Sequence, residues 1–130
     1  MVSAPGLLLS DDLLFSSRIA ATARSLGLEL RTLRSAGDVQ ASAAQQSPAC
    51  VILDLANPSL NIAEAVPALK TGGARIIAYG SHVDTATLQA ARDAGCDIVL
   101  PRSKFVEQLP TEMTKWFGFE ARSGSEGSEQ

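Results

Sequence analysis

Three aspartates stand out in this sequence because each follows a short apolar run. Asp54 follows the run at residues 50–53, and Asp11 and Asp12 follow the run at residues 7–9 after one serine. Runs that are apolar on both faces are typical of central parallel strands, and ligands collect at the carboxyl ends of such strands. One acidic cluster alone fits a helix cap or a turn, but two clusters in the same relation to a strand favour an acidic pocket.

The chemistry that fits such a pocket involves a divalent cation and a phosphoryl group. Mg²⁺ prefers oxygen ligands, usually a few carboxylates with waters and phosphate oxygens completing its coordination. Transfer of a phosphoryl group to a carboxylate brings an anionic nucleophile to an anionic donor, so a cation must offset the charge. Three aspartates at the ends of neighbouring strands supply a site for such a cation.

Composition limits the classes of protein to which the chain can belong. Its 130 residues and formal net charge of −3 fit one domain with an ordinary core, and the lack of a Lys/Arg run argues against a nucleic-acid surface. Neither a signal-peptide pattern nor an apolar stretch of about 20 residues occurs, so we expect a cytoplasmic protein without membrane contact. Cys50 and Cys96 lie beside apolar strand candidates and are expected to be free thiols rather than a disulfide.

Strand-like and helix-like segments alternate along the chain. Apolar runs and alternating residues predict five strands, at residues 6–10, 28–34, 50–55, 74–79 and 97–100. Helical periodicity, caps that include Asn61 and Asp84, and glycine stops that include Gly95 predict helices at residues 13–26, 37–46, 61–70 and 85–94. Pro110 suits the first position of a last helix that ends near residue 117, after a single turn at residues 103–108. Pro67 is expected to kink or shorten the third helix.

This alternation predicts an α/β fold built on a doubly wound parallel sheet. We expect the flavodoxin-like strand order 2-1-3-4-5 with helices on both faces, because the first and third strands are the most completely apolar and therefore central. The carboxyl ends of these two strands carry Asp11, Asp12 and Asp54. Residues 1–118 form the expected domain, and the Ser/Gly/Glu-rich residues 119–130 are expected to form a disordered tail.

The order of these motifs resembles the receiver domain of two-component response regulators, the CheY-like family. The resemblance rests on the acidic pair, on Asp54, on Pro58 four residues later, on the Ala-Gly-Cys-Asp segment at residues 94–97, and on a cation after the fifth strand. It extends to about residue 117. It implies that Asp54 is the phosphoacceptor, and that Mg²⁺ is held by Asp11, Asp12, Asp54 and the backbone carbonyl of Ala56.

The chain departs from the family pattern near the end of the fourth strand. Where most receivers have Ser or Thr to hydrogen-bond the phosphoryl group, this chain has Gly80, with Ser81 one position along. The resemblance therefore makes Ser81 the candidate for the catalytic hydroxyl. Tyr79 and His82 are expected to border the pocket, with His82 as a loop residue, since one imidazole alone makes neither a metal site nor a catalytic triad.

A second set of departures surrounds the fifth strand. Where the family has a lysine, this chain has Arg102, with Lys104 two positions further. Arg102 can pair with a phosphate through its planar fork but is not an equivalent point charge, and Lys104 is expected to be a solvated loop charge. Val99 stands where many receivers have an aromatic residue. Signalling through contact between a hydroxyl and that aromatic residue is therefore not expected here.

The resemblance implies a stand-alone receiver module of a phosphorelay. It would accept a phosphoryl group on Asp54 from a sensor histidine kinase or phosphotransfer protein, and would signal by binding a downstream protein, with homodimerisation left open. It would not be an enzyme beyond Mg²⁺-dependent self-phosphorylation and dephosphorylation. Gly80, Arg102 and Val99 motivate the alternative, a receiver-like interaction domain that works without phosphate. A flavin-binding module is the weaker third reading, because the acidic pair would repel an anionic ligand.

Overall fold

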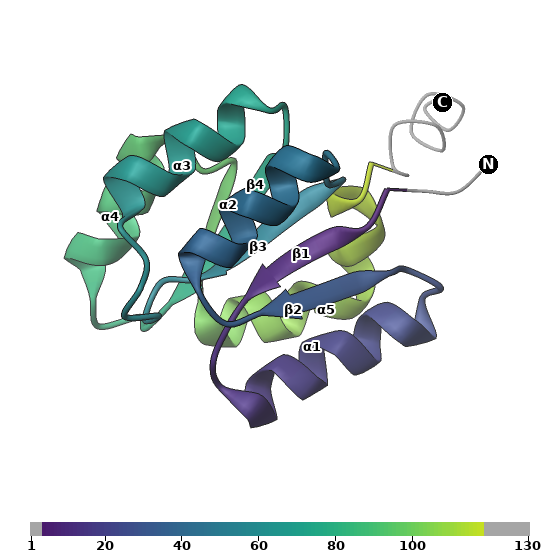
Figure 1. The fold of residues 1–130 in the computed structure, drawn as a ribbon. Coiled ribbons are helices and arrows are strands. Elements are labelled where there is room, and N and C mark those ends of the chain that lie inside the picture. The colour runs from purple at the N-terminus through teal and green to yellow at the C-terminus, as the bar shows by residue number, and fades with distance from the viewer. Residues whose placement is uncertain (1–3, 119–130) are drawn as a thin grey trace, which may run out of the picture.

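A sheet of five parallel strands forms the centre of the molecule (Figure 1). The computed structural model describes residues 4–118, so the tail expected at residues 119–130 lies outside the described residues. The strands are β1 (Gly6–Leu9), β2 (Leu30–Leu33), β3 (Cys50–Asp54), β4 (Arg75–Gly80) and β5 (Ile98–Pro101). Their order, β2-β1-β3-β4-β5, confirms the flavodoxin-like arrangement predicted from the sequence.

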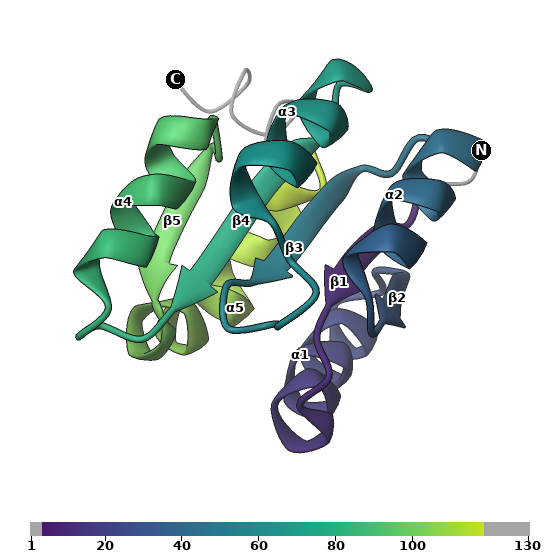
Figure 2. The ribbon, with the colours of Figure 1, turned by 60° about the vertical axis from the view of Figure 1, so that its left-hand side comes forward.

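Five helices cover the two faces of this sheet (Figure 2). They are α1 (Leu13–Ser25), α2 (Ala36–Gln45), α3 (Ile62–Thr71), α4 (Thr85–Ala94) and α5 (Arg102–Trp116). Buried residues of α1 and α5 pack with one set of strand side chains, and those of α2, α3 and α4 pack with the other set. The molecule therefore has three layers, with the sheet in the middle.

The central strands divide their side chains between these two layers. In β3, Ile52 packs in the layer of α1 and α5, whereas Val51 and Leu53 pack in the layer of α2, α3 and α4. All three are completely buried, as expected for a strand covered on both sides. Since each such side chain contributes about 1.5–3 kcal/mol when buried, the apolar runs fix the centre of the sheet.

Side-chain caps start four of the helices. The side-chain oxygens of Asp12, Ser35, Asn61 and Asp84 each accept a hydrogen bond from the backbone amide three residues later, at 3.0 to 3.2 Å. Asn61 and Asp84 were predicted as caps, and so was the glycine stop of α4, where Gly95 has a positive φ of 112°. These caps set where each helix begins, and hence where the loops at the carboxyl edge of the sheet lie.

The last helix differs from the sequence prediction. We expected a single turn followed by a helix from Pro110, but α5 runs without interruption from Arg102 to Trp116 with Pro110 inside it. The buried residues Phe105, Leu109, Met113 and Trp116 recur at helical spacing along one face, while Pro110 is on the exposed side. Burial of this face outweighs the hydrogen bond that the proline removes.

The third helix also continues through its proline, since α3 spans Ile62–Thr71 with Pro67 inside.

Both cysteines are free thiols, as predicted: Cys50 is buried and Cys96 half-buried. Burial raises the pKa of Cys50 to about 12 and that of Cys96 to about 11, which keeps both in the unreactive thiol form. Within residues 4–118, no helix combines the length and the apolar character needed to cross a bilayer.

Candidate functional site

Three polar side chains form a row across the carboxyl edge of the sheet. Asp54, the last residue of β3, pairs in register with Tyr79 of β4, and extension of the pairing between Leu9 and Leu53 places Ser10 on its other side. Strand alternation points Asp54 toward the layer of α1 and α5, the side on which Ile52 packs. Ser10, Asp54 and Tyr79 are 1%, 3% and 0% exposed, so polar groups are buried side by side at this edge.

The Asp54 carboxylate is held in one orientation and is costly to ionise. Its Oδ1 accepts a hydrogen bond from the backbone amide of Ala56 at 2.9 Å. Burial raises the pKa of Asp54 above its usual value; the Ala56 amide and the Arg102 cation lower it, and the charges of Asp11 and Asp12 raise it further. A cation bound beside Asp54 would therefore stabilise its charged form.

The acidic pair after β1 divides into two different roles. Asp12 is the N-cap of α1, with Oδ1 accepting from the amide of Phe15 at 3.0 Å and Oδ2 lying 3.9 Å from Nη1 of Arg102. Asp11 is exposed and makes no hydrogen bond or ion pair with the described part of the chain. Asp12 is thus committed to the helix start, and Asp11 is the acid available to a ligand.

The donor atoms fit Mg²⁺ in type, but not as a cage of three carboxylates. Among residues 4–118, no three acidic, histidine or cysteine side chains lie close enough together to hold a metal ion. The engagement of Asp12 with Phe15 and Arg102 gives a physical reason for this. Because Mg²⁺ usually keeps several waters and takes only one or two carboxylates, Asp54, Asp11 and the Ala56 carbonyl are a sufficient donor set.

Arg102 lies across the edge of the sheet at the start of α5. Its guanidinium carbon is 4.8 Å from the centroid of the Phe15 ring and 5.9 Å from that of Tyr79. The ion pair with Asp12 is long, and each side chain is 42% exposed, so it contributes little to stability. The aromatic contacts instead orient the planar fork, which can take two oxygens of an anion.

At the end of β4, where most receivers carry a hydroxyl, a side chain would fit only tightly against two leucines. A Cβ atom on the buried Gly80 would lie 3.3 Å from Cδ1 of Leu55 and 3.5 Å from Cδ2 of Leu88, and both leucines belong to the core. Ser81 is exposed one residue later, with its Oγ accepting from the amide of Val83 at 3.4 Å. The next hydroxyl along the chain is that of Ser81, in a more exposed position.

Lys104 and His82 are both exposed, but Lys104, which was expected in a loop, lies in the first turn of α5. Lys104 pairs with Glu107 at 3.5 Å on the solvent side of α5, with both side chains more than half exposed. His82 is an exposed residue of the loop between β4 and α4. Neither contributes to the row that contains Asp54.

Tyr79 has a role that sequence reasoning missed. Its ring stacks on Phe105 at 4.5 Å and lies 5.1 Å from Phe15, and Phe105 in turn stacks on Trp116 at 5.5 Å. Among the described residues its hydroxyl has no hydrogen-bond partner. Burial, and then the charge of Asp54, raise the pKa of Tyr79, so the phenol stays protonated. The sequence could have indicated the position of Tyr79 beside Asp54 only if the register between β3 and β4 had been predicted.

Comparisons with known proteins agree on the architecture. No family model and no curated protein matches the sequence. Among solved structures, the receiver domain of sensor histidine kinase PA1611 from Pseudomonas aeruginosa PAO1, which has a magnesium ion in its active site cleft, superposes with a TM-score of 0.77 at 21% identity. That match covers 90% of this chain and 99% of the other.

Two further structures give the same result. A CheY-like receiver domain protein from Methanospirillum hungatei JF-1 has a TM-score of 0.77 at 16% identity, covering 95% of this chain and 100% of the other. A signal receiver domain from Bermanella marisrubri has a TM-score of 0.76 at 21% identity, covering 88% and 98%. Over residues 4–118 the chain therefore has the CheY-like fold of response-regulator receiver domains.

Proposed function

We propose that this chain is a receiver module that accepts a phosphoryl group on Asp54 in the presence of Mg²⁺. The observation that carries the proposal is the placement of Asp54 at the carboxyl end of the central strand, buried between Ser10 and Tyr79, with Arg102 close enough to affect its ionisation. In an open α/β sheet this edge is where chemistry is performed.

The geometry gives each residue a part in the transfer. The Ala56 amide holds Oδ1 of Asp54, which leaves Oδ2 to form the new bond to phosphorus. The bond between phosphorus and the donor's leaving atom breaks, and its electron pair departs with the leaving group. Arg102 and Ser81 would bind phosphoryl oxygens. Mg²⁺, held by Asp11, Asp54 and the Ala56 carbonyl while Asp12 caps α1, would supply the positive charge that offsets nucleophile and donor.

The surroundings of the site support exchange with another protein. Large apolar side chains are exposed at three positions near this edge: Leu13 is 69%, Leu14 is 88% and Val83 is 75% exposed. Leu13 and Leu14 adjoin each other at the start of α1, and adjoining exposed apolar groups mark interaction surfaces. We propose a sensor histidine kinase or phosphotransfer protein as the donor and a downstream protein as the target, with catalysis limited to self-phosphorylation and dephosphorylation.

A second candidate is a receiver-like interaction domain that does not use phosphate. It is favoured by the absence of a hydroxyl side chain at Gly80 and by the commitment of Asp12 to the helix cap and to Arg102. Both features weaken the phosphoryl site without disturbing the fold.

One experiment separates the two candidates. The protein is incubated with Mg²⁺ and acetyl phosphate, and intact mass spectrometry detects an added phosphoryl group, with beryllofluoride binding as a check on a short-lived product. Modification that requires Mg²⁺, is lost in Asp54→Asn and persists in the matched surface variant Asp93→Asn supports the receiver. If the folded protein is not modified and does not bind beryllofluoride, the phosphate-independent domain stands instead.

A further inference from the structure

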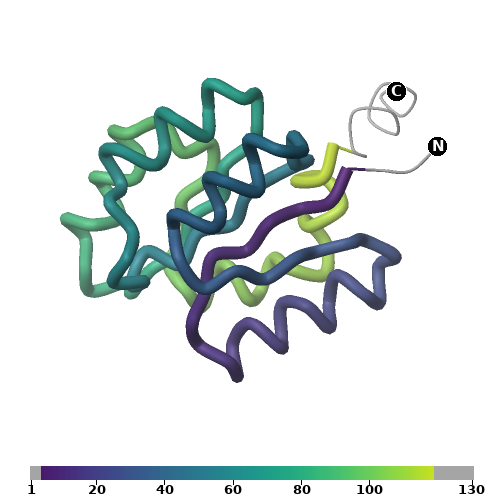
Figure 3. The backbone as a smooth tube through the Cα atoms, in the orientation of Figure 1, coloured from purple at the N-terminus to yellow at the C-terminus, as the bar shows by residue number. Residues whose placement is uncertain are grey.

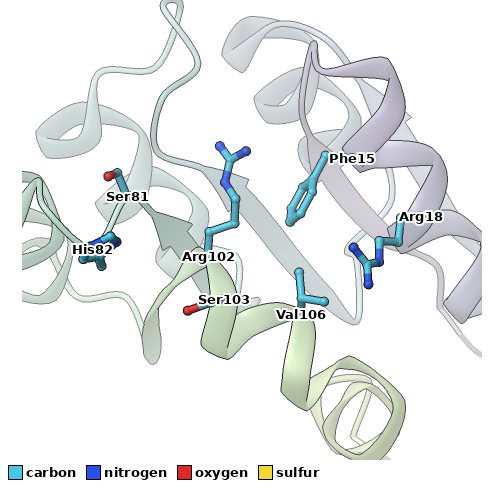
Figure 4. A pocket seen from close by; sticks show the side chains of 7 residues that line it. All are labelled: Phe15, Arg18, Ser81, His82, Arg102, Ser103 and Val106. Atoms are coloured by element: carbon cyan, nitrogen blue, oxygen red, sulfur yellow. The ribbon is translucent and has the colours of Figure 1, made fainter.

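A cavity of about 560 Å³ lies beside the Asp54 row, between α1, α5 and the loop after β4 (Figure 4). Its walls are formed by Phe15, Arg18, Ser81, His82, Arg102, Ser103 and Val106. None of the three aspartates of the candidate site lines it. The cavity is therefore a neighbour of the Asp54 site, and the two share Ser81 and Arg102.

Two guanidinium groups line this cavity, and acidic side chains neutralise little of their charge. Arg18, in the second turn of α1, has no ion-pair partner within residues 4–118. Arg102 has only the 3.9 Å contact with Asp12. Figure 4 shows Phe15 and Val106 between these two arginine side chains. Because Phe15 and Val106 separate the two guanidinium groups, an anionic group would pair with Arg18, while Ser81, His82 and Ser103 offer further hydrogen-bond donors.

The remaining walls suit a flat apolar body. Phe15 is half-buried and already has the Arg102 cation over its ring at 4.8 Å, and Val106 adds an aliphatic wall on α5. A volume of about 560 Å³ falls within the range of small-molecule sites and far exceeds one phosphate ion. The cavity thus has the volume for a small molecule, an aromatic wall and two arginine side chains.

We propose that this cavity binds a small organic anion in which an aromatic ring carries a phosphate or carboxylate group. The ring packs against Phe15 and Val106 on the side of Arg102, and the anionic group pairs with Arg18. Binding does not depend on phosphorylation of Asp54. A consequence that rests on the proposed function is that the ligand, by engaging Arg102, changes how readily Asp54 accepts a phosphoryl group.

The test is a titration of the full chain with phenyl phosphate, monitored through the backbone amide chemical shifts in two-dimensional NMR spectra. We expect saturable shifts at Phe15, Arg18 and Val106, and an affinity at least about tenfold above those of inorganic phosphate, which lacks the ring, and benzyl alcohol, which lacks the charge. Benzoate in place of phenyl phosphate distinguishes a carboxylate from a phosphate requirement. The same titration in Asp54→Asn is expected to give the same affinity, which separates this cavity from the phosphoryl site.

Variants identify the residues responsible. Arg18→Gln removes an exposed guanidinium and should weaken phenyl phosphate binding about tenfold with an unchanged melting temperature, whereas Arg24→Gln, at the other arginine of α1, should change nothing. Val106→Asp places a carboxylate in the wall and should weaken binding at least as much. Equal binding of inorganic phosphate, shifts confined to the Asp54 loop, or full affinity in both cavity variants would each overturn the proposal. Failure of Asp54 to be phosphorylated would contradict the proposed function but not the proposal that this cavity binds an organic anion.

Discussion

Asp54 is a buried acid whose own environment disfavours its charge. Burial raises its pKa, and the Ala56 amide and Arg102 offset this only in part. An acid with a raised pKa in the folded state adds stability at low pH and loses that contribution as the pH rises through the raised pKa. The charged Asp54 therefore lowers the free energy of unfolding at neutral pH, in exchange for a reactive carboxylate at the edge of the sheet.

This balance predicts the effect of removing the charge. Asp54→Asn keeps an oxygen for the Ala56 amide and should raise the melting temperature at pH 7 by a few degrees. The gain should shrink as the pH falls through the raised pKa, because the wild-type carboxyl then becomes neutral as well. Thermal unfolding of both proteins between about pH 4 and pH 8 measures this. The exposed change Asp93→Asn should show no such pH-dependent gain, and an equal gain in both variants would contradict the assignment.

The unpaired hydroxyl of Tyr79 leads to a second prediction at this scale. A buried donor without a partner costs about 1–3 kcal/mol, so Tyr79→Phe should raise the free energy of unfolding by about 1 kcal/mol. The phenylalanine ring keeps the stacking on Phe105, whereas Tyr79→Leu loses it and should be destabilised. Urea unfolding distinguishes these cases. Loss of stability in Tyr79→Phe would show that the hydroxyl has a partner, for which the neighbouring Ser10 is the nearest candidate.

Among the elements, Asp97 joins α3, β4 and the start of β5. Its carboxylate accepts two hydrogen bonds from Nζ of Lys70, at 2.7 and 2.8 Å, and one from the Ile76 amide at 2.7 Å. Burial opposes ionisation, but the hydrogen bonds from Lys70 and Ile76 prevail and hold the pKa of Asp97 below its usual value. The Ala-Gly-Cys-Asp segment that contributed to the family resemblance therefore has a structural purpose here.

The expected cost of losing this junction follows from the two kinds of bond. Asp97→Ala should lower the free energy of unfolding by about 1–2 kcal/mol, mainly because the Ile76 amide loses its partner. Asp97→Asn can still accept from that amide and loses only a half-exposed ion pair, so its loss should stay below about 1 kcal/mol. With a lowered pKa, the wild-type advantage exists at neutral pH and disappears as the pH falls through that pKa. Urea unfolding at neutral and acidic pH checks both points, and a pH-independent difference would contradict them.

Elements were predictable where apolar periodicity and caps agree. The strand order followed from the complete apolarity of the runs that became β1 and β3, and Asn61 and Asp84 marked helix starts. The continuity of α5 was missed because Pro110 is a local signal, whereas burial of the helix face is a tertiary one. For the same reason the sequence located the acidic pair but did not show which aspartate caps α1.

Across the whole molecule, the two helical layers are joined by strands that contribute to both. Successive residues of β1, β3 and β4 enter alternate layers, so neither layer can come apart while the sheet remains intact. Figure 3 shows that the described chain starts and ends at the same end of the molecule, where a Cβ on Gly6 would collide with the ring of Phe117. This close packing holds the end of α5 against β1.

A destabilising substitution in one layer should therefore also lower the stability of the other layer. Leu69, on α3, is 4% exposed in the layer of α2, α3 and α4, and Leu69→Ala should lower the free energy of unfolding by about 2–4 kcal/mol. Trp116, the single tryptophan, lies in the layer of α1 and α5, so its fluorescence reports on the opposite face. In urea, the midpoint from Trp116 fluorescence should fall together with that from circular dichroism, which averages all helices. Ala68→Ser, at the exposed neighbouring position, should shift neither midpoint appreciably. If Trp116 kept its midpoint while the dichroism midpoint fell, the layers would unfold separately, and the shared strands would not couple them.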